Sequence, residues 1–119
     1  MNLRWRATRI AGEVLENDGV CMDGDASIGR VRLHEYGFKP PGWHWSMYAD
    51  APGTIPRSFA FHGKVDTKEE AKAAVEEAYA HFVAATPDAR AYYQKAAREM
   101  RERAEMFEAR RAGRVPIDS

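Results

Sequence analysis

The side chains with the most binding chemistry lie between residues 28 and 65, on one face of three strand-like runs. Alternate positions of these runs separate basic, histidine and tyrosine side chains from large apolar ones. Arginine and lysine attract phosphate, and tyrosine or histidine rings can stack on bases. This outer face, on which we expect no acid except Glu35 and Asp50 at its rims, predicts a surface that binds nucleic acid or a nucleoprotein complex. Its members are Arg30, Arg32, His34, His44, Ser46, Tyr48, Ser58, His62 and Lys64. The alternative is a face that is polar because it is open to water.

The same residues give little support to a metal site or a hydrolase. His34, His44 and His62 fall on separate runs, without the close His-x-His spacing of many metal sites. His44, Ser46 and Asp50 share a face, but His44 and Ser46 are about 7 Å apart along a strand. No nucleophile elbow precedes Ser46. We therefore expect no enzyme activity, no metal and no cofactor.

The strands that would position the outer face are predicted at Ile28–Glu35, Trp43–Ala49 and Arg57–Val65. Period-two alternation also predicts an opening strand near Leu3–Thr8. Inward positions are expected for Val31, Leu33, Trp43, Trp45, Met47, Phe59 and Phe61.

Turn signals divide the first third of the chain. Asn17-Asp18-Gly19 predicts a hairpin turn between short arms at 13–16 and 20–22. A second turn is predicted at Asp23-Gly24-Asp25, and Lys39-Pro40-Pro41-Gly42 must interrupt regular structure.

A first helix is predicted from Thr67, because Thr67 and Glu70 have the spacing of a capping box. Its apolar side chains recur every three or four residues, which predicts one stripe that covers the sheet. The stripe comprises Ala71, Ala74, Val75, Ala78, Tyr79, Phe82 and Val83.

A second helix is predicted from the N-cap Thr86, with Pro87 in its first turn, to about Ala112 before Gly113. Its thin stripe has the rhythm of a short coiled-coil seam. Three interpretations are open: a solvated helix packed by its first half, a dimer contact through Tyr93, Met100 and Phe107, or a basic arm on phosphates. The stripe comprises Tyr93, Ala97, Met100, Ala104 and Phe107.

Composition limits the broad class of the protein. The 119 residues carry 18 basic and 18 acidic side chains, so the formal net charge of +0 gives no long-range attraction to polyanions. The single cysteine, Cys21, lies between Asp18 and Asp23, which predicts an inert thiol. The N-terminus lacks the apolar region of a signal peptide, and no run is long enough to span a membrane. We expect a cytoplasmic protein without membrane contact.

Part of the pattern resembles known groups. Gly29-Arg30-Val31, Trp43-x-Trp45-Ser46 and Thr67-x-Glu69-Glu70-Ala71 resemble short, uncharacterised bacterial proteins, which implies no activity. The junction from Gly63 to Ala71 is more loosely similar to arm-type DNA-binding domains of phage integrases, in which a three-stranded sheet enters the major groove. It is also similar to HicB-like antitoxins, in which a sheet-helix half-domain binds a toxin and pairs with itself. The close-set tryptophans are typical of neither characterised group.

The sequence predicts an α+β fold: an antiparallel meander of three to five strands, one helix on its apolar face, and a long charged C-terminal helix. Residues 1–85 would form the sheet-plus-helix domain, 86–113 the C-terminal helix and 114–119 a tail. The expected function is non-catalytic binding of phage or mobile-element type, with nucleic acid or a nucleoprotein complex as partner. The alternative is a protein-binding regulator or inhibitor, antitoxin-like, for which a homodimer through the C-terminal helix is one option.

Overall fold

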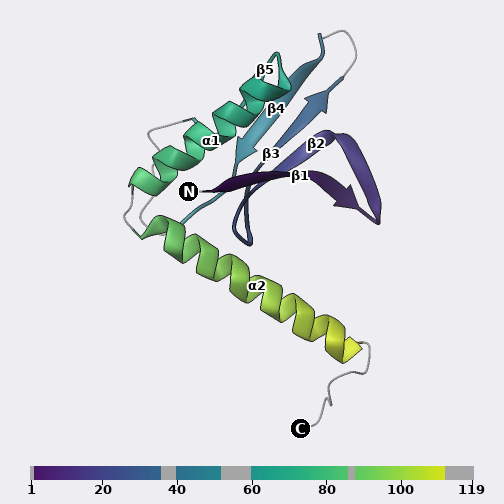
Figure 1. The fold of residues 1–119 in the computed structure, drawn as a ribbon, viewed down its shortest axis with the longest axis vertical. Helices are drawn as coiled ribbons and strands as arrows, with labels where there is room; N and C mark the ends of the chain where they lie inside the picture. Colours follow the sequence, from purple (N-terminus) through teal and green to yellow (C-terminus); the bar gives the residue numbers. More distant parts are fainter. Residues whose placement is uncertain (1, 36–39, 52–59, 86–87, 112–119) are drawn as a thin grey trace.

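The computed structural model describes residues 2–35, 40–51, 60–85 and 88–111. In these ranges one antiparallel sheet has the strand order β1-β2-β3-β4-β5, and two helices follow it (Figure 1). The α+β class and the antiparallel sheet are confirmed. The elements are β1 (Leu3–Ile10), β2 (Glu13–Asp23), β3 (Ala26–His34), β4 (Gly42–Met47), β5 (His62–Val65), α1 (Lys68–Ala85) and α2 (Ala89–Arg111).

The first hairpin turns at Ala11-Gly12, so the turn predicted at Asn17-Asp18-Gly19 is wrong. Ala11 and Gly12 have φ of 52° and 84°, the positive values that a tight hairpin turn requires. The residues Asn17 and Asp18 lie instead inside β2, where the register with β1 shifts from Ala7↔Gly19 to Thr8↔Leu15. Residues that favour turns also suit a bulge, which explains the misplaced prediction. The second predicted turn is confirmed at Gly24-Asp25.

A second irregularity sets the facing of β3. The register between β2 and β3 shifts from Cys21↔Gly29 to Met22↔Ser27, so Ile28 has no register partner on β2. Ile28 and Gly29 therefore both turn toward the core, and both are buried. Beyond this bulge the alternation is regular, and Val31 is fully buried.

The predicted last strand is found in part. Of the described residues 60–65, His62–Val65 form β5, whereas Ser58 and Phe59 lie outside the described residues. The inward position expected for Phe61 is wrong, because Phe61 precedes β5 and is 41% exposed. Its ring contacts the edge of the His62 ring, with centroids 5.0 Å apart.

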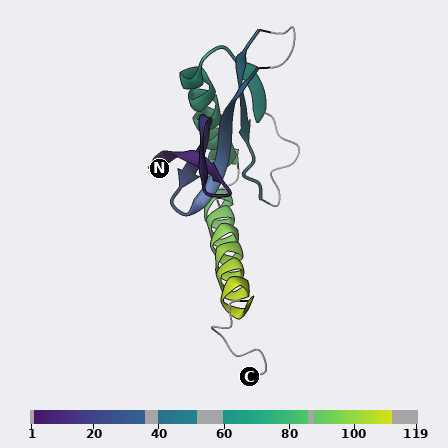
Figure 2. The same ribbon diagram turned by 90° about the vertical axis from the view of Figure 1, so that its right-hand side faces the viewer.

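Helix α1 begins as the capping box predicts. The Thr67 hydroxyl accepts a hydrogen bond from the Glu70 N–H at 3.1 Å and donates one to the Glu70 carboxylate at 2.9 Å. The helix lies across the inner face of β3, β4 and β5 (Figure 2). Its buried side chains are Ala71, Val75, Ala78, Tyr79 and Phe82.

The core lies between α1 and the sheet, where Trp45 and Met47 are buried as predicted. Gly29 lets α1 approach closely, because a Cβ at this position would collide with the Val75 side chain and lie 2.8 Å from the Ser46 carbonyl oxygen. Trp43 is half-buried at the margin, where the Lys68 ammonium lies 5.6 Å from the centre of its ring.

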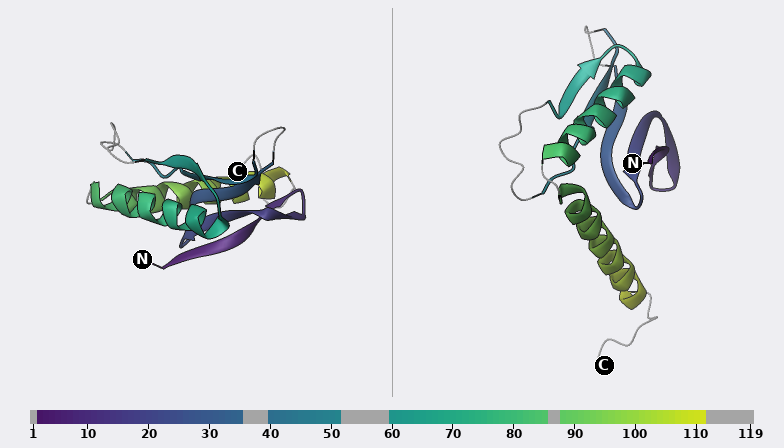
Figure 3. Two further views of the ribbon diagram at one scale, coloured as in Figure 1. Left: turned by 90° about the horizontal axis from the view of Figure 1, so that it is seen from above. Right: turned by 60° about the vertical axis from the view of Figure 1, so that its left-hand side comes forward.

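Helix α2 packs on this body by its first half and then projects away from it (Figures 1 and 3). Tyr93 and Ala97 pack against the core cluster, and Ala89 is the buried residue of the helix. The radius of gyration is 17.0 Å, against about 13 Å for a compact domain of about 100 residues. The projecting half of α2 accounts for this elongation. Thr86, Pro87 and Gly113 lie outside the described residues.

Candidate functional site

The outer face assembles in two cross-strand rows. The register places Arg30 opposite Ser46 and Ser46 opposite His62. In the next row Arg32 lies opposite His44, and His44 lies opposite Lys64. His34 lies on β3 two residues beyond Arg32, next to the second row. Its ring stacks on that of His44, with the two ring centroids 5.4 Å apart. The alternation in the sequence therefore placed these side chains on one face correctly.

Arg30 is not a free cation on this face. The bulge in β2 brings Asp18 against it, and Arg30 Nε donates to Asp18 Oδ1 at 2.7 Å while Nη2 pairs with Oδ2. The Thr8 hydroxyl donates to the same Oδ1 at 2.7 Å. Burial raises the pKa of Asp18, but the hydrogen bonds from Arg30 and Thr8 outweigh it, so the pKa is lowered.

The expectation that the centre of this face carries no acid is therefore wrong. Asp18 is 8% exposed and lies opposite Arg32 in the register of β2 and β3. The misplaced turn at Asn17-Asp18-Gly19 hid this contact, because only a continuous β2 carries Asp18 into the sheet. Of the three basic side chains on the described part of this face, Arg32 and Lys64 are exposed.

His44 is the histidine of this face whose environment favours the neutral form. Burial lowers the pKa of His44, and the neighbouring His34, Arg32 and His62 lower it further. Lys64 donates a hydrogen bond to the Pro40 carbonyl at 3.3 Å. Arg32 and Lys64 are therefore the exposed basic side chains of this face that are not paired with a carboxylate in the described part of the chain.

Tyr48 follows β4 and stands apart from the two rows. Its hydroxyl pairs with the Ser27 hydroxyl and donates to the Gly29 carbonyl at 3.4 Å. The ring is 43% exposed, so part of it is open to a partner. Ser58, the remaining member of the predicted face, lies outside the described residues.

The described residues give little support to a metal site or to a catalytic nucleophile. No group of three or more histidine, cysteine, aspartate or glutamate side chains there could hold a metal ion. Asp50 accepts a hydrogen bond from the Ala51 N–H at 2.9 Å. Cys21 is fully buried, and burial with the nearby Glu76 and Asp23 carboxylates raises its pKa to about 12.

The predicted self-association stripe on α2 divides into two parts. Tyr93 is half-buried in its own domain, donates to the Ser27 carbonyl at 2.6 Å and contacts the edge of the Phe82 ring. Met100 and Phe107 lie on the projecting half and are 69% and 65% exposed. Only these two members of the predicted contact set are open to a partner.

Sequence reasoning missed the polar contact that fixes α2 to the sheet. Asp23 is 1% exposed and accepts hydrogen bonds from the Tyr79 hydroxyl at 2.6 Å and from Arg90 Nε at 2.7 Å. The hydrogen bonds from Arg90 lower the pKa of Asp23, although burial opposes them. Gln94 Nε2 also donates to the Asp23 carbonyl at 3.3 Å. The sequence showed Asp23 only as a turn residue.

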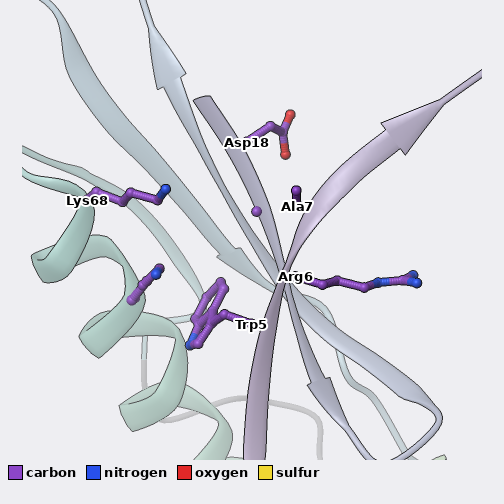
Figure 4. A pocket seen from close by; sticks show the side chains of 7 residues that line it. Trp5, Arg6, Ala7, Asp18 and Lys68 are labelled. Atoms are coloured by element: carbon purple, nitrogen blue, oxygen red, sulfur yellow. The ribbon is translucent and has the colours of Figure 1, made fainter. Parts of the chain in front are cut away.

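Sequence reasoning also missed a pocket between the β1–β2 hairpin and α1 (Figure 4). Its lining includes Trp5 and two lysines of the first two turns of α1, Lys68 and Lys72. The spacing of these lysines is visible in the sequence, but the position of Trp5 beside them depends on how the sheet curls around α1.

In the part of the chain that is described, neither α1 nor α2 combines the length and the apolar composition needed to cross a membrane.

Comparison of the chain with protein-family models, with curated proteins and with solved structures finds no match.

Proposed function

We propose that this chain is a non-catalytic, protein-binding regulator that pairs with a second copy of itself through the projecting half of α2. The exposure of Met100 and Phe107 carries the proposal. These side chains continue the stripe whose first members, Tyr93 and Ala97, already pack on the domain. Pairing would remove this apolar surface from water, which stabilises an assembly by about 25 cal/mol per Å².

The charges beside the stripe favour a second copy as the occupant. In a heptad that places Met100 and Phe107 at d, Arg103 falls at g and Glu108 at e. In a parallel pair the g side chain of one helix meets the following e side chain of the other. Arg103 would therefore meet Glu108 of the second copy, and the reciprocal pair would form on the other side. The small Ala104 at a makes the seam narrow, so we expect weak association.

Sedimentation equilibrium over a range of concentrations tests this pairing. We expect a monomer–dimer equilibrium that Met100→Glu or Phe107→Glu weakens at least about tenfold, equivalent to about 1.4 kcal/mol. Met106→Glu is the matched control, because Met106 is also exposed at 48% but lies off the stripe. A monomer at every concentration, or a dimer that both stripe variants leave intact, would overturn the proposal.

A second candidate function, contact with nucleic acid, is favoured by the row that joins Arg32, His44 and Lys64 across three neighbouring strands. Phosphate contacts from Arg32 and Lys64 would make affinity fall steeply with salt. Fluorescence anisotropy with labelled duplex and single-stranded DNA at several salt concentrations measures this. Arg32→Ala and Lys64→Ala should each reduce the salt slope by about one, and Lys95→Ala on α2 should not. Binding that is insensitive to salt would reject this candidate.

A further inference from the structure

The pocket between the first hairpin and α1 combines an aromatic wall with two ammonium groups. It encloses about 160 Å³, close to the roughly 150 Å³ of an apolar cavity that accepts benzene. Figure 4 shows the Lys68 side chain reaching toward the pocket from α1, with Trp5 below it and the Arg6 side chain directed away. The lining comprises Trp5, Arg6, Ala7, Asp18, Gly19, Lys68 and Lys72.

The two lysines lie one helical turn apart, and like charges at this spacing repel. The Lys72 ammonium lies 5.5 Å from the centre of the Trp5 ring, and Lys68 lies 5.6 Å from that of Trp43. Neither lysine forms an ion pair with a carboxylate among the described residues. Both side chains are half-buried, so their charges are only partly hydrated. The indole faces attract these cations but do not neutralise them.

The nearby acids are already engaged. The Asp18 carboxylate accepts hydrogen bonds from Arg30 and Thr8 on the outer face. Glu76, one turn beyond Lys72, accepts the Trp5 indole N–H at 3.0 Å. This hydrogen bond fixes the indole as a wall of the pocket. The pocket is lined by three cationic side chains, Arg6, Lys68 and Lys72, and by one carboxylate, that of Asp18, so its net charge is positive.

From this geometry we propose that the pocket binds a small organic anion with an apolar body about one aromatic ring in size. Its carboxylate or phosphate group would contact the ammonium groups of Lys68 and Lys72, and its ring would lie against Trp5. Pockets that join an apolar wall to a few convergent polar groups are typical sites for such ligands. The lining residues belong to β1, β2 and α1, and none belongs to α2, so this inference does not depend on the proposed pairing through α2.

Titration with benzoate and phenyl phosphate tests the site, with the Trp5 indole N–H resonance as the probe. The resonance is assigned by comparison with a Trp5→Phe variant. We expect a saturable shift at millimolar concentrations from at least one of these anions. Inorganic phosphate, which lacks the ring, and benzyl alcohol, which lacks the charge, should each bind at least about fivefold more weakly, because each satisfies only half of the site. The relative strength of benzoate and phenyl phosphate identifies the preferred head group.

Substitutions then separate this pocket from general attraction between the protein and anions. Lys68→Gln and Lys72→Gln should each weaken binding at least about fivefold, whereas Lys95→Gln, which removes an exposed lysine of α2, should leave it unchanged. Gly19→Val adds bulk to the wall, where a Cβ would meet Val31 and Trp5 at ordinary distances of 3.5 and 3.8 Å. It should block binding while the remaining resonances show an intact fold.

Three results would overturn the proposal. The first is the absence of a saturable shift from either aromatic anion at tens of millimolar. The second is binding that survives the double change Lys68→Gln and Lys72→Gln. The third is equal binding of benzyl alcohol and benzoate, which would show an apolar cavity without preference for an anion.

Discussion

Two aspartates of β2, Asp18 and Asp23, are nearly inaccessible to solvent, and each accepts hydrogen bonds from one arginine. A buried carboxylate without a partner is strongly unfavourable, so each arginine compensates a charge that the fold has removed from water. Arg30 does this for Asp18 within the sheet, and Arg90 does it for Asp23 between the sheet and α2. Arg30 therefore has a structural role that its place on the outer face does not reveal.

Removing Arg30 should damage the fold, and removing Arg32 should not. Arg30→Ala leaves Asp18 without its charged partner, so we expect the free energy of unfolding to fall by about 1–3 kcal/mol. Arg32 is exposed, and Arg32→Ala should change stability by less than about 0.5 kcal/mol. Urea denaturation of the two variants measures the difference, and equal stabilities would contradict the role assigned to Asp18.

Acid should weaken the fold through the same two carboxylates. Their pKa values are lower in the folded protein than in the unfolded chain, where aspartate titrates near about 3.9. Between the folded and the unfolded pKa the unfolded chain therefore binds more protons than the folded protein. The contribution of these carboxylates to stability is complete above about pH 5. It is lost as the pH falls through the unfolded pKa and then through the folded pKa. Asp23→Asn should lower stability at pH 7 and flatten its dependence between about pH 5 and pH 3. If the urea midpoint of Asp23→Asn had the same pH dependence as that of the wild type, Asp23 would not contribute to the loss of stability in acid.

At the scale of the elements, the contact between α1 and the sheet depends on the small size of Gly29. An added methyl group there would meet Val75 on one side and the β4 backbone on the other. Neither can move far, because Val75 is fully buried and the Ser46 carbonyl belongs to the sheet.

We expect Gly29→Ala to lower the free energy of unfolding by about 1–3 kcal/mol through overpacking. Gly19→Ala is the control, since the nearest atom to its new Cβ would lie 3.5 Å away. Thermal unfolding followed by circular dichroism gives both values. Equal melting temperatures for the two variants would mean that α1 lies farther from β3 than the structure places it.

The same layer depends on Trp45, which is 7% exposed and packs under α1. Trp45→Ala should lower the free energy of unfolding by about 3–5 kcal/mol, a large fraction of the stability of a small domain. An unchanged melting temperature would show that the indole does not face the core.

At the scale of the whole molecule, α2 has two different environments along its length. Asp23 holds its first turns through Arg90 and Gln94, and Arg101 reaches Asp25 at 3.0 Å. Beyond Arg101 the helix leaves the sheet, and the Arg111 guanidinium lies 6.0 Å from the centre of the exposed Phe107 ring. An isolated solvated helical segment of this length gains little from its own hydrogen bonds. A partner along the stripe would stabilise it.

The sequence predicted what depends on periodicity and missed what depends on register. Alternation alone placed Arg32, His44 and Lys64 on one face, and the capping box at Thr67 located the start of α1. The first hairpin turn was missed because Ala11 adopts a positive φ that alanine rarely shows. The pairs Asp18–Arg30 and Asp23–Arg90 join residues 12 and 67 positions apart. No local pattern encodes such contacts, because they depend on a bulge and on the docking of α2.

Hydrogen exchange measured at low and at high protein concentration tests the central claim most directly. If α2 pairs with α2, amides of residues 98–111 should exchange more slowly at high concentration, while those of β3 and β4 keep the same rates. Met100→Glu should abolish the difference in α2. Exchange in residues 98–111 that is independent of concentration, or protection that appears on the sheet instead, would contradict the account.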